Sequence, residues 1–199
     1  MSKVQFGISD VTVFERTENN LGADSSITYS NPMAVPGAVS ISLDPQGDQN
    51  IFYADNIKYW VGNTNQGYEG DLEIAMLPDD FKKKYLGYVT AANGNLVETD
   101  IVGKSFGMVF KFKTDTEDRY AVLYNCTVAR PTEEHNTVEE SADPDTITLT
   151  ITVAGESVAY IGSGDINATT VQAFKAEVRP SDSNYATVKT ALALPTFDE

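Results

Sequence analysis

The chain has 199 residues, of which 41% are hydrophobic, so it carries enough apolar material to fold as a domain with its own core. Its 14 basic residues face 29 acidic ones, which leaves a formal net charge of −15. Binding to the phosphates of nucleic acid, or to an anionic membrane surface, requires clustered Lys and Arg, so this charge argues against both functions.

The cysteine count and the lengths of the apolar runs limit the cellular compartments in which we expect the protein. Cys126 is the only cysteine, so no intramolecular disulfide can form. The first residues, "MSKVQFGISDV", lack the basic and apolar regions of a signal peptide, and no apolar run approaches the length of a membrane span. We therefore expect a protein that is made and kept in the cytoplasm, or that leaves it without the secretory route.

Alternating apolar and polar residues predict strands along most of the chain. The pattern begins in "KVQFGIS" and is clearest in "TITLTITV", where a face of threonines is typical of a solvated sheet face. Further strands are predicted for "GMVFKFK", "YAVLYNCTVA" and residues 36–43, 50–61, 67–76, 95–101 and 171–178. Short turn sequences predict connections between neighbouring strands: "NTNQG" at 63–67, "NGN" at 93–95 and "TDTED" at 114–118.

Two stretches are longer and more polar than the connections of a compact domain usually are. The first lies at about residues 15–35 and contains "ERTENNLGADSSITYSNPM". The second, residues 130–145, carries six carboxylates and one base, Arg130. We predict long loops at both places. Since no internal repeat or linker is visible, residues 1–199 are predicted to form a single domain.

The segment "IFYADNIKYW", residues 51–60, places an acid among apolar residues. If the segment is one strand, Asp55 shares a face with apolar and aromatic residues: Ile51, Tyr53, Ile57 and Tyr59. We hypothesise that Asp55 is a buried acceptor for a backbone or tyrosine donor at a strand bend. The parity of the apolar residues shifts at Asp55–Asn56, which indicates a bulge there.

The next predicted strand carries a row of acids in "YEGDLEIAML". Glu69, Asp71 and Glu73 share one face, and Tyr68, Leu72, Ile74 and Met76 share the other. Same-face neighbours on a strand are roughly 7 Å apart, whereas Ca²⁺ needs several oxygens at about 2.3–2.6 Å from the ion. A straight row is a poor metal cage, so the sequence predicts an exposed acidic sheet face rather than a metal site.

Two stretches have the pattern of a short helix. In "LPDDFKKKYLG", Pro78 suits the first helical position, acids precede lysines as the helix dipole favours, and Gly87 marks the end. In "SDSNYATVKTALAL", Ser181 to Ser183 are candidate caps. The apolar residues expected to face the sheet are Phe81, Tyr85 and Leu86 in the first stretch, and Tyr185, Val188, Ala191 and Leu192 in the second. The fold class predicted is mainly β, with a flanking α-helix and a short C-terminal helix.

No set of residues predicts catalysis, a metal or a cofactor. His135, the only histidine, lies in the acidic 130–145 stretch, where a solvated side chain is the simplest interpretation. Cys126 lies on the apolar face of its strand and is expected to be a small buried hydrophobic residue. One histidine and one cysteine do not make a zinc site, and "GSGDIN" at 162–167 lacks the Lys-Ser/Thr of a phosphate loop. The residues alone indicate a binding or assembly protein rather than an enzyme.

The order and wording of the segments also resemble a known family. "YSNPMAVPGAVSISLDPQGDQNIFYADNIKYW" is followed by "GYEGDLEIAMLPDDFKKKYLGY", "NGNLVE", "FGMVFKFKTDTEDRYAVLYNC", the acidic stretch, "DTITLTITV" and a closing "FKAEV…NYATVKTALALP". From about residue 30 almost to the C-terminus, this resembles the major tail protein, or tail tube protein, of long-tailed, non-contractile bacteriophages. The "YADN" strand, the "EGDLE" strand and the "LPDDF" helix carry the resemblance.

The resemblance implies a β-sandwich or partly closed barrel with a flanking helix. It implies a structural virion protein that is assembled in the host cytoplasm into hexameric rings, which join sheet edges and stack into a tube. The implied partners are other copies of the chain and the tape-measure, tail tip and tail terminator proteins, and DNA passes without specific binding. Glu69, Asp71 and Glu73 are then candidates for an acidic lumen lining that repels phosphates, and the 130–145 stretch is another. Asp55 has a second interpretation as an ion-pair partner across the subunit interface.

Three alternatives stay open. A non-catalytic β-sandwich that binds carbohydrate or a host surface would use exposed aromatics such as Tyr59, Trp60 and Tyr68. A tail-associated hydrolase would need a catalytic set that the chain lacks. A related ring protein from a contractile tail or a secretion machine is the closest alternative. No sheath-binding feature can be read in the sequence, so the preference for a non-contractile tail rests on the resemblance.

Overall fold

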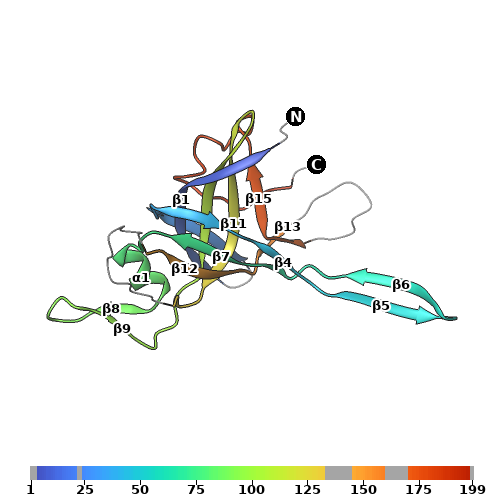
Figure 1. Ribbon diagram of the computed structural model, residues 1–199, viewed down its shortest axis with the longest axis horizontal. Coiled ribbons are helices and arrows are strands. Elements are labelled where there is room, and N and C mark those ends of the chain that lie inside the picture. Colours follow the sequence, from blue (N-terminus) through green and yellow to red (C-terminus); the bar gives the residue numbers. More distant parts are fainter. Residues whose placement is uncertain (1–3, 22–23, 133–144, 160–169, 198–199) are drawn as a thin grey trace, which may run out of the picture.

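The structure is a computed structural model that describes residues 4–21, 24–132, 145–159 and 170–197. Within these residues the fold is mainly β, as predicted, with one helix and no closed barrel, and it is consistent with the predicted β-sandwich. Nine strands form one antiparallel sheet in the order β2-β1-β10-β11-β12-β7-β3, with β15 also paired to β11 and β4 to β7. Three two-stranded sheets, β5–β6, β8–β9 and β13–β14, extend from it (Figure 1).

The element bounds are as follows. The strands of the large sheet are β1 (Gln5–Leu21), β2 (Asp24–Ala34), β3 (Ala38–Ile41), β4 (Asp44–Gln46), β7 (Gly67–Ile74), β10 (Phe106–Thr114), β11 (Asp118–Val128), β12 (Ile147–Val153) and β15 (Lys175–Val178). The remaining elements are β5 (Gln49–Ala54), β6 (Ile57–Asn63), α1 (Asp79–Tyr85), β8 (Tyr88–Thr90), β9 (Leu96–Glu98), β13 (Glu156–Ala159) and β14 (Thr170–Ala173).

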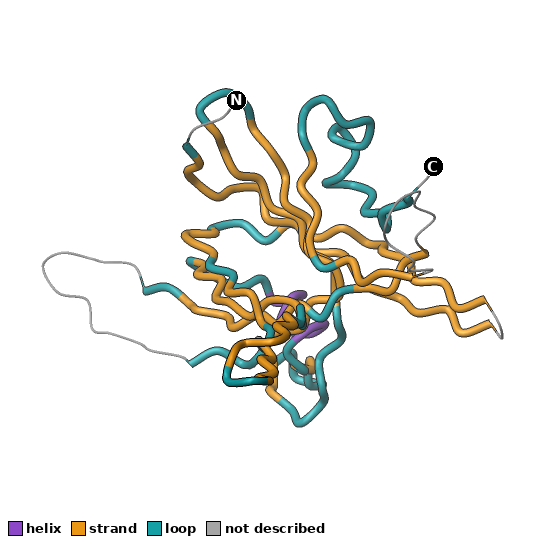
Figure 2. The backbone as a smooth tube through the Cα atoms, turned by 90° about the vertical axis from the view of Figure 1, so that its right-hand side faces the viewer, coloured by secondary structure: helices purple, strands orange, loops and turns teal. Residues whose placement is uncertain are grey.

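Strand β11 changes partner along its length, and this bends the sheet. Residues 120–123 pair with β15, whereas residues 126–128 pair with β12. Asn125, between the two paired stretches, has a φ of 50°, a left-handed conformation that Asn tolerates better than most residues. On one side of this bend the strands separate into two groups (Figure 2), as in a sandwich rather than a flat sheet.

The two central strands β10 and β11 are buried on both faces. On one face Met108, Phe110 and Leu123 belong to a cluster with residues of β1, β7 and β12, and α1 covers it with Phe81 and Tyr85. On the other face a second cluster forms around residues of β1, β10, β11 and β15: Phe14, Val109, Tyr120, Val122, Tyr124 and Val178. Val188 and Leu192 of the C-terminal segment complete the second cluster.

The helix α1 forms as its sequence predicts. Pro78 precedes it in an extended conformation, Asp79 and Asp80 occupy its first turn, and lysines occupy its last turn. The rings of Tyr85 and Phe81 lie 4.7 and 5.9 Å from the ring of Phe106, measured between centroids. Gly87 follows with a φ of 76°, which favours glycine. The "NGN" and "TDTED" turns are also confirmed, because they join the paired strands β8–β9 and β10–β11.

The predicted loop at about residues 15–35 is wrong. β1 and β2 pair through Leu21 and Asp24 as a long ribbon. Residues 11–14 are buried in the core, but residues 17–19 are exposed, because the ribbon continues beyond the core. The polarity of the outer part of the ribbon therefore reflects its position beyond the core and not the absence of a strand. The 130–145 stretch lies largely outside the described residues.

Two further expectations differ from the structure. Residues 50–61 are two strands and not one, and the "NTNQG" segment leads back to β7 without pairing β6 to it. The predicted C-terminal helix is a run of turns: Val188 and Ala191 donate to carbonyls four residues back, but Tyr185, Thr187 and Thr190 donate to carbonyls three residues back. The hydroxyls of Thr187 and Thr190 also donate to carbonyls three residues back, and such local bonds compete with a regular helix.

None of the described helical residues forms a segment long and apolar enough to cross a membrane. In the overall shape, the β5–β6 hairpin projects from one end of the sheet, and α1 with the β8–β9 hairpin lies at the opposite end (Figure 1). The sheet thus separates two extensions that come from neighbouring parts of the sequence.

The C-terminal turns are predicted to be an integral part of the core. Leu192 is 6% exposed, and its side chain lies over Gly107, where an added Cβ would be 2.5 Å from Leu192 Cδ2. We expect Leu192→Ala to cost about 2–3 kcal/mol and to lower the Tm by about 5–10 °C. Val102→Ala is the matched control, because Val102 is 89% exposed. Equal melting of the two variants would show that residues 179–194 do not cover the sheet.

Candidate functional site

The structure brings Glu69, Asp71 and Glu73 together on one face of β7, as the alternation predicts. Gly70, Leu72 and Ile74 point to the buried side, while Glu69 and Asp71 are exposed and Glu73 is half-buried. Met76 was expected on the buried face, but it lies beyond the end of β7 and is 73% exposed. We call Glu69, Asp71 and Glu73, with Asp44 beside them on β4, the acidic stripe.

Hydroxyl groups flank the stripe on both sides. On β12 the residues opposite Glu73, Asp71 and Glu69 are Thr148, Thr150 and Thr152. Thr150 Oγ1 donates to Asp71 Oδ1 at 2.8 Å. On the other side Ser42 Oγ accepts from the backbone N–H of Asp71 at 3.2 Å. The predicted solvated threonine face and the acidic row are therefore one continuous polar surface.

Both carboxylate oxygens of Glu73 are held in place. Thr146 Oγ1 donates to Oε1 at 2.7 Å, and Ser40 Oγ donates to Oε2 at 2.9 Å. These hydrogen bonds, the one from Thr146 first, lower the pKa of Glu73 below its usual value. The group thus keeps its charge to a lower pH than a free glutamate.

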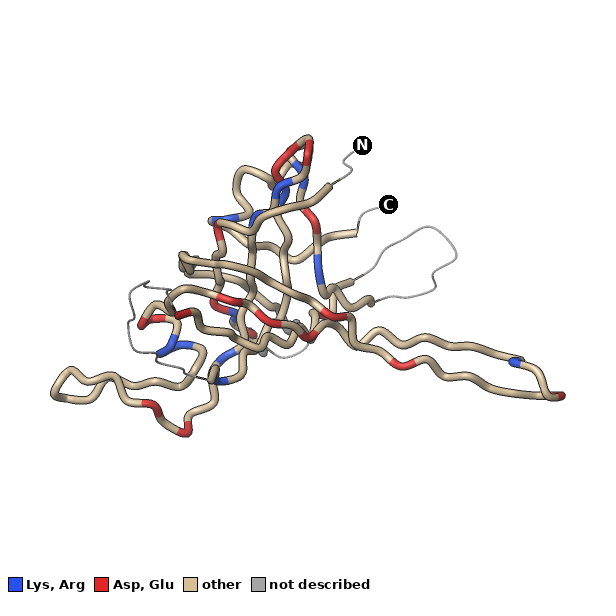
Figure 3. Tube along the Cα trace, viewed as in Figure 1, with Lys and Arg blue, Asp and Glu red and all other residues tan. Residues whose placement is uncertain are grey.

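No cation of the described residues neutralises the acidic stripe. Asp44 lies directly opposite Glu69, a pairing of like charges that destabilises a sheet. Among the ion pairs of the described residues, none includes a member of the stripe. Figure 3 shows acidic positions following one another along β7. The surface therefore presents net negative charge to whatever faces it.

Other carboxylates of the sheet are paired with cations, so the lack of pairing is particular to the acidic stripe. Asp10 lies 3.1 Å from Lys189 and 3.3 Å from Lys111, and the pKa of Asp10 is lowered chiefly by its hydrogen bond with Lys189. Glu15 lies 3.4 Å from Lys104 and 3.6 Å from Lys84. Lys84, Lys104, Lys111 and Lys189 thus lie beside carboxylates on β1, whereas no described cation pairs with a carboxylate on β7.

Asp55 lies far from the acidic stripe. Asp55 and Asn56, with φ of 52° and 60°, form the two-residue turn of the β5–β6 hairpin, as in a type I′ turn. Asp55 is exposed, so the hypothesis of a buried acceptor is wrong. The shift in the parity of the apolar residues has another cause. The chain reverses at the Asp55–Asn56 turn, and the β5–β6 pairing also shifts its register between Phe52 and Tyr53. An ion pair of Asp55 across a subunit interface stays a prediction.

A second polar cluster joins β13 to the large sheet. The Arg16 guanidinium pairs with the Glu156 carboxylate, which is 3% exposed, and Tyr29 Oη donates to Glu156 Oε1 at 3.1 Å. Tyr29 Oη also accepts from the backbone N–H of Asn125 at 3.2 Å. Burial, with the charge of Glu156, raises the pKa of Tyr29. Such a pair is costly to break from one side, and it fixes the bend at Asn125 rather than forming an open site.

The remaining candidate residues form no site. Cys126 is fully buried, and burial raises the pKa of its thiol, as expected of a structural cysteine. Among the described side chains, no group of three Asp, Glu, His or Cys is placed to hold a metal ion. His135 and the "GSGDIN" segment lie outside the described residues.

Comparison with known families decides the identity of the chain. Residues 2–194 match the family model described as phage tail tube protein. The chain belongs to the phage tail tube protein family. It is therefore a structural component of a phage tail, and so of the virion, and this membership indicates a non-enzymatic role. The tail tube part of the resemblance is confirmed, and its restriction to long-tailed, non-contractile phages stays a prediction.

Comparisons with individual proteins are more distant. No curated protein matches the chain. One similar solved structure is described as the cryo-EM structure of the anti-feeding prophage (AFP) baseplate, 6-fold symmetrised. The identity is 9%, the TM-score is 0.36, and the match covers 90% of this chain and 98% of that chain. This likeness is too distant to support a conclusion about fold or function.

The sequence did not reveal one surface, the exposed apolar side chains of the β5–β6 hairpin. Residues 50–61 were predicted as one strand with a buried Asp55, and exposed aromatics such as Trp60 were expected only for a carbohydrate-binding module. In the structure Phe52, Ile57 and Trp60 are all exposed. The "DN" dipeptide between two apolar runs was the available signal, since Asp and Asn tolerate the positive φ of a two-residue hairpin turn.

The hydrogen bonds to Glu73 predict how the stability of the fold depends on pH. We expect Ser40→Ala combined with Thr146→Val to raise the pKa of Glu73 toward its usual value, as measured by NMR titration of the side-chain carboxyl carbon. Because the folded-state pKa is depressed, the stabilisation is present above the pKa of an unfolded glutamate and is lost as pH falls through the folded-state pKa. Thr152→Val is the control, since Thr152 lies opposite Glu69. An unchanged titration curve in the double variant would contradict the assignment.

Proposed function

We propose that the chain builds the tail tube of a long-tailed, non-contractile phage, by forming hexameric rings that stack into a tube through which DNA passes. The family match over residues 2–194 is the observation that carries the proposal. The finer claims, which are the hexamer, the stacking and the passage of DNA, rest on the resemblance and are supported by three features of the fold.

The first feature is the free sheet edges. Among the described strands of the large sheet, β2 lies at one end of the order and β3 at the other, and each is paired on one side only. Exposed strand edges promote association, because their unpaired N–H and C=O groups accept another strand. If β2 of one copy pairs with the β3–β4 edge of the next, identical contacts repeat and close a ring when the rotation permits.

The second feature is the acidic stripe. DNA carries about one negative charge per 1.7 Å of helix axis, so a wall with unneutralised carboxylates repels it and prevents sticking. Glu69, Asp71 and Glu73 meet this requirement, and the hydroxyls around them add no positive charge. We assign this face of β7 and β12 to the lumen of the tube.

The third feature is the pair of extensions at opposite ends of the molecule (Figure 1). Such extensions suit contacts between successive rings, and the tape-measure, tail tip and tail terminator proteins are the further partners that the proposal includes. DNA is a passing cargo in this scheme and not a bound ligand.

A second candidate function rests on the exposed Tyr59 and Trp60, which a carbohydrate-binding module would use. Tyr68 does not join them, because it lies on β7 and packs against the core. A glycan array tests this function: binding to a defined sugar favours the module, and a blank array with ring formation disposes of it.

Assembly is the first prediction of the proposed function. We expect the concentrated chain to form rings or hollow tubes, seen by negative-stain electron microscopy, with a rise in mass measured by light scattering. Addition of tail tip complexes should promote the same polymer by providing a template. A chain that stays monomeric at high concentration with tail tips present would count against the proposal.

The lumen assignment is tested by removing charge from the stripe. We expect tubes of the variant Glu69→Gln, Asp71→Asn, Glu73→Gln to retain a short fluorescent single-stranded DNA that wild-type tubes do not retain, as measured by fluorescence anisotropy. The control variant, Glu18→Gln, Asp48→Asn, Asp100→Asn, removes the same charge from exposed residues elsewhere. Equal retention by both variants would place the stripe outside the lumen.

A further inference from the structure

The β5–β6 hairpin, residues 49–63, exposes an unusual amount of apolar surface. We call it the arm. Six large side chains are between 47% and 69% exposed: Phe52, Tyr53, Ile57, Tyr59, Trp60 and Val61. None of these belongs to either core cluster or to the side chains packed against them. Contiguous exposed apolar surface of this kind marks an interaction site.

The register of the arm divides its side chains between two faces. Residues directly opposite one another in an antiparallel pair share a face. Phe52 therefore shares a face with Trp60, and Tyr53 shares the other face with Lys58. Trp60 folds back over Gly62, where an added Cβ would lie 2.1 Å from the indole ring. The Tyr53–Lys58 face, next to the turn, thus combines an aromatic ring with a cation.

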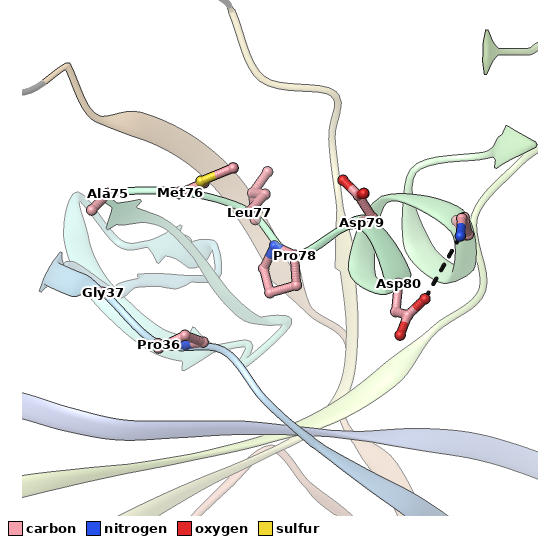
Figure 4. Close-up of a pocket in the computed structure, with 9 residues that line it drawn as sticks. Pro36, Gly37, Ala75, Met76, Leu77, Pro78, Asp79 and Asp80 are labelled. Atoms are coloured by element: carbon pink, nitrogen blue, oxygen red, sulfur yellow. Dashed lines mark ion pairs between the residues drawn. The ribbon is translucent and has the colours of Figure 1, made fainter. Parts of the chain in front are cut away.

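A groove lies at the other end of the molecule, beside α1. Its walls are the segment from β2 to β3 and the segment from β7 to α1, joined where Ala75 N–H donates to Gly37 carbonyl oxygen at 2.8 Å. The groove has a volume of about 660 Å³ and is lined chiefly by Pro36, Gly37, Ala75, Met76, Leu77 and Pro78, with Asp79, Asp80 and Lys83 at its α1 end (Figure 4). Met76 is 73% exposed, so it presents an apolar side chain to a partner at this groove.

The charges of the two surfaces are complementary. Asp80 is 3.8 Å from Lys83, but Asp79 forms no ion pair with the described residues. Lys58 forms none either, although the chain has only 14 basic residues for 29 acidic ones. The arm therefore offers an aromatic ring and a free cation, and the groove offers an apolar floor and a free carboxylate.

The arm and α1 lie at opposite ends of the molecule, so the arm and the groove beside α1 do not meet within one copy (Figure 1). Two complementary surfaces at opposite ends of one chain make head-to-tail contacts between copies. We propose that the arm of one copy docks in the groove beside α1 of a second copy, with Tyr53 against Met76 and Lys58 paired with Asp79. This inference rests on the proposed function, in which the chain associates with itself, and it names the two surfaces that touch.

The size of the contact suits one part of a larger interface. An aromatic side chain buries roughly 150–250 Å² when fully covered, so Tyr53, which is 58% exposed, buries on the order of 100 Å² in the groove. A stable interface buries about 800 Å² per partner. The docked arm alone is therefore a weak contact, and it becomes effective when the ring supplies many copies of it at once.

Disulfide trapping tests the contact directly. A full-length Lys58→Cys variant is mixed with a full-length Asp79→Cys variant and oxidised, and a cross-linked dimer is expected. Cys126 is fully buried and does not compete. The matched control is Lys113→Cys with Asp79→Cys, because Lys113 is an exposed lysine on β10, away from the arm. Equal cross-linking of both mixtures, or none of the first, overturns the proposal.

Charge reversal provides the second readout. We expect Lys58→Glu and Asp79→Lys each to raise the concentration needed for assembly about fivefold to tenfold, and the two changes combined in one chain to restore it. Lys113→Glu should have no such effect. The melting of the monomer should be unchanged in Lys58→Glu and Lys113→Glu, whereas Asp79→Lys should lower it slightly, because it also reverses an acid in the first turn of α1. Impaired assembly in Lys58→Glu that Asp79→Lys does not restore places the arm on another surface.

The outcomes separate this inference from the proposed function. Rings that form without the Lys58–Asp79 disulfide overturn the docking and leave the tail tube intact. A Lys58–Asp79 disulfide without rings supports the docking and contradicts the tail tube proposal. If neither the disulfide nor rings form, both proposals are wrong.

Discussion

Burial of the β10–β11 hairpin on both faces is the constraint on which the rest of the structure depends. Strands covered on one side only would leave Val109, Val122 and Tyr124 in water, so the chain must return to cover them. The C-terminal turns do so with Val188 and Leu192, while α1 covers the opposite face with Phe81 and Tyr85. The partner change of β11 at Asn125 allows one strand to belong to both layers.

Because these two clusters hold the core, the outer elements are free to carry other surfaces. β7 contributes Leu72 and Ile74 to the core with one face and leaves its carboxylates on the other. The arm contributes nothing to either cluster, so its side chains are constrained only by the turn and by their own cross-strand pairs. Core stability and surface function thus reside in different residues, and substitutions in one set need not disturb the other.

Sequence patterns predicted the parts of the fold in which one local rule decides the outcome. Period-2 alternation was sufficient for β12 and for the two faces of β7, and charge order with Pro78 was sufficient for α1. Polarity was misleading in β1 and β2, where strands continue beyond the core. The turn at Asp55 and the turns near Thr187 depend on local hydrogen bonds and positive φ, which periodicity does not report. The groove depends on segments about 40 residues apart, such as Pro36 and Met76, so it was not visible in the sequence.

The distribution of charge connects solubility with assembly. A net charge of −15 makes separate copies repel one another, which keeps them soluble and opposes any contact that buries little area. Several lysines lie beside Asp10 and Glu15 on β1 and in the last turn of α1, and none of the described cations pairs with the acidic stripe. Repulsion between copies favours contacts that bury apolar surface and also place opposite charges together. Such contacts offset the repulsion better than apolar burial or a single ion pair alone. The repulsion also contributes to specificity, since a juxtaposition that brings two unpaired carboxylates together is disfavoured.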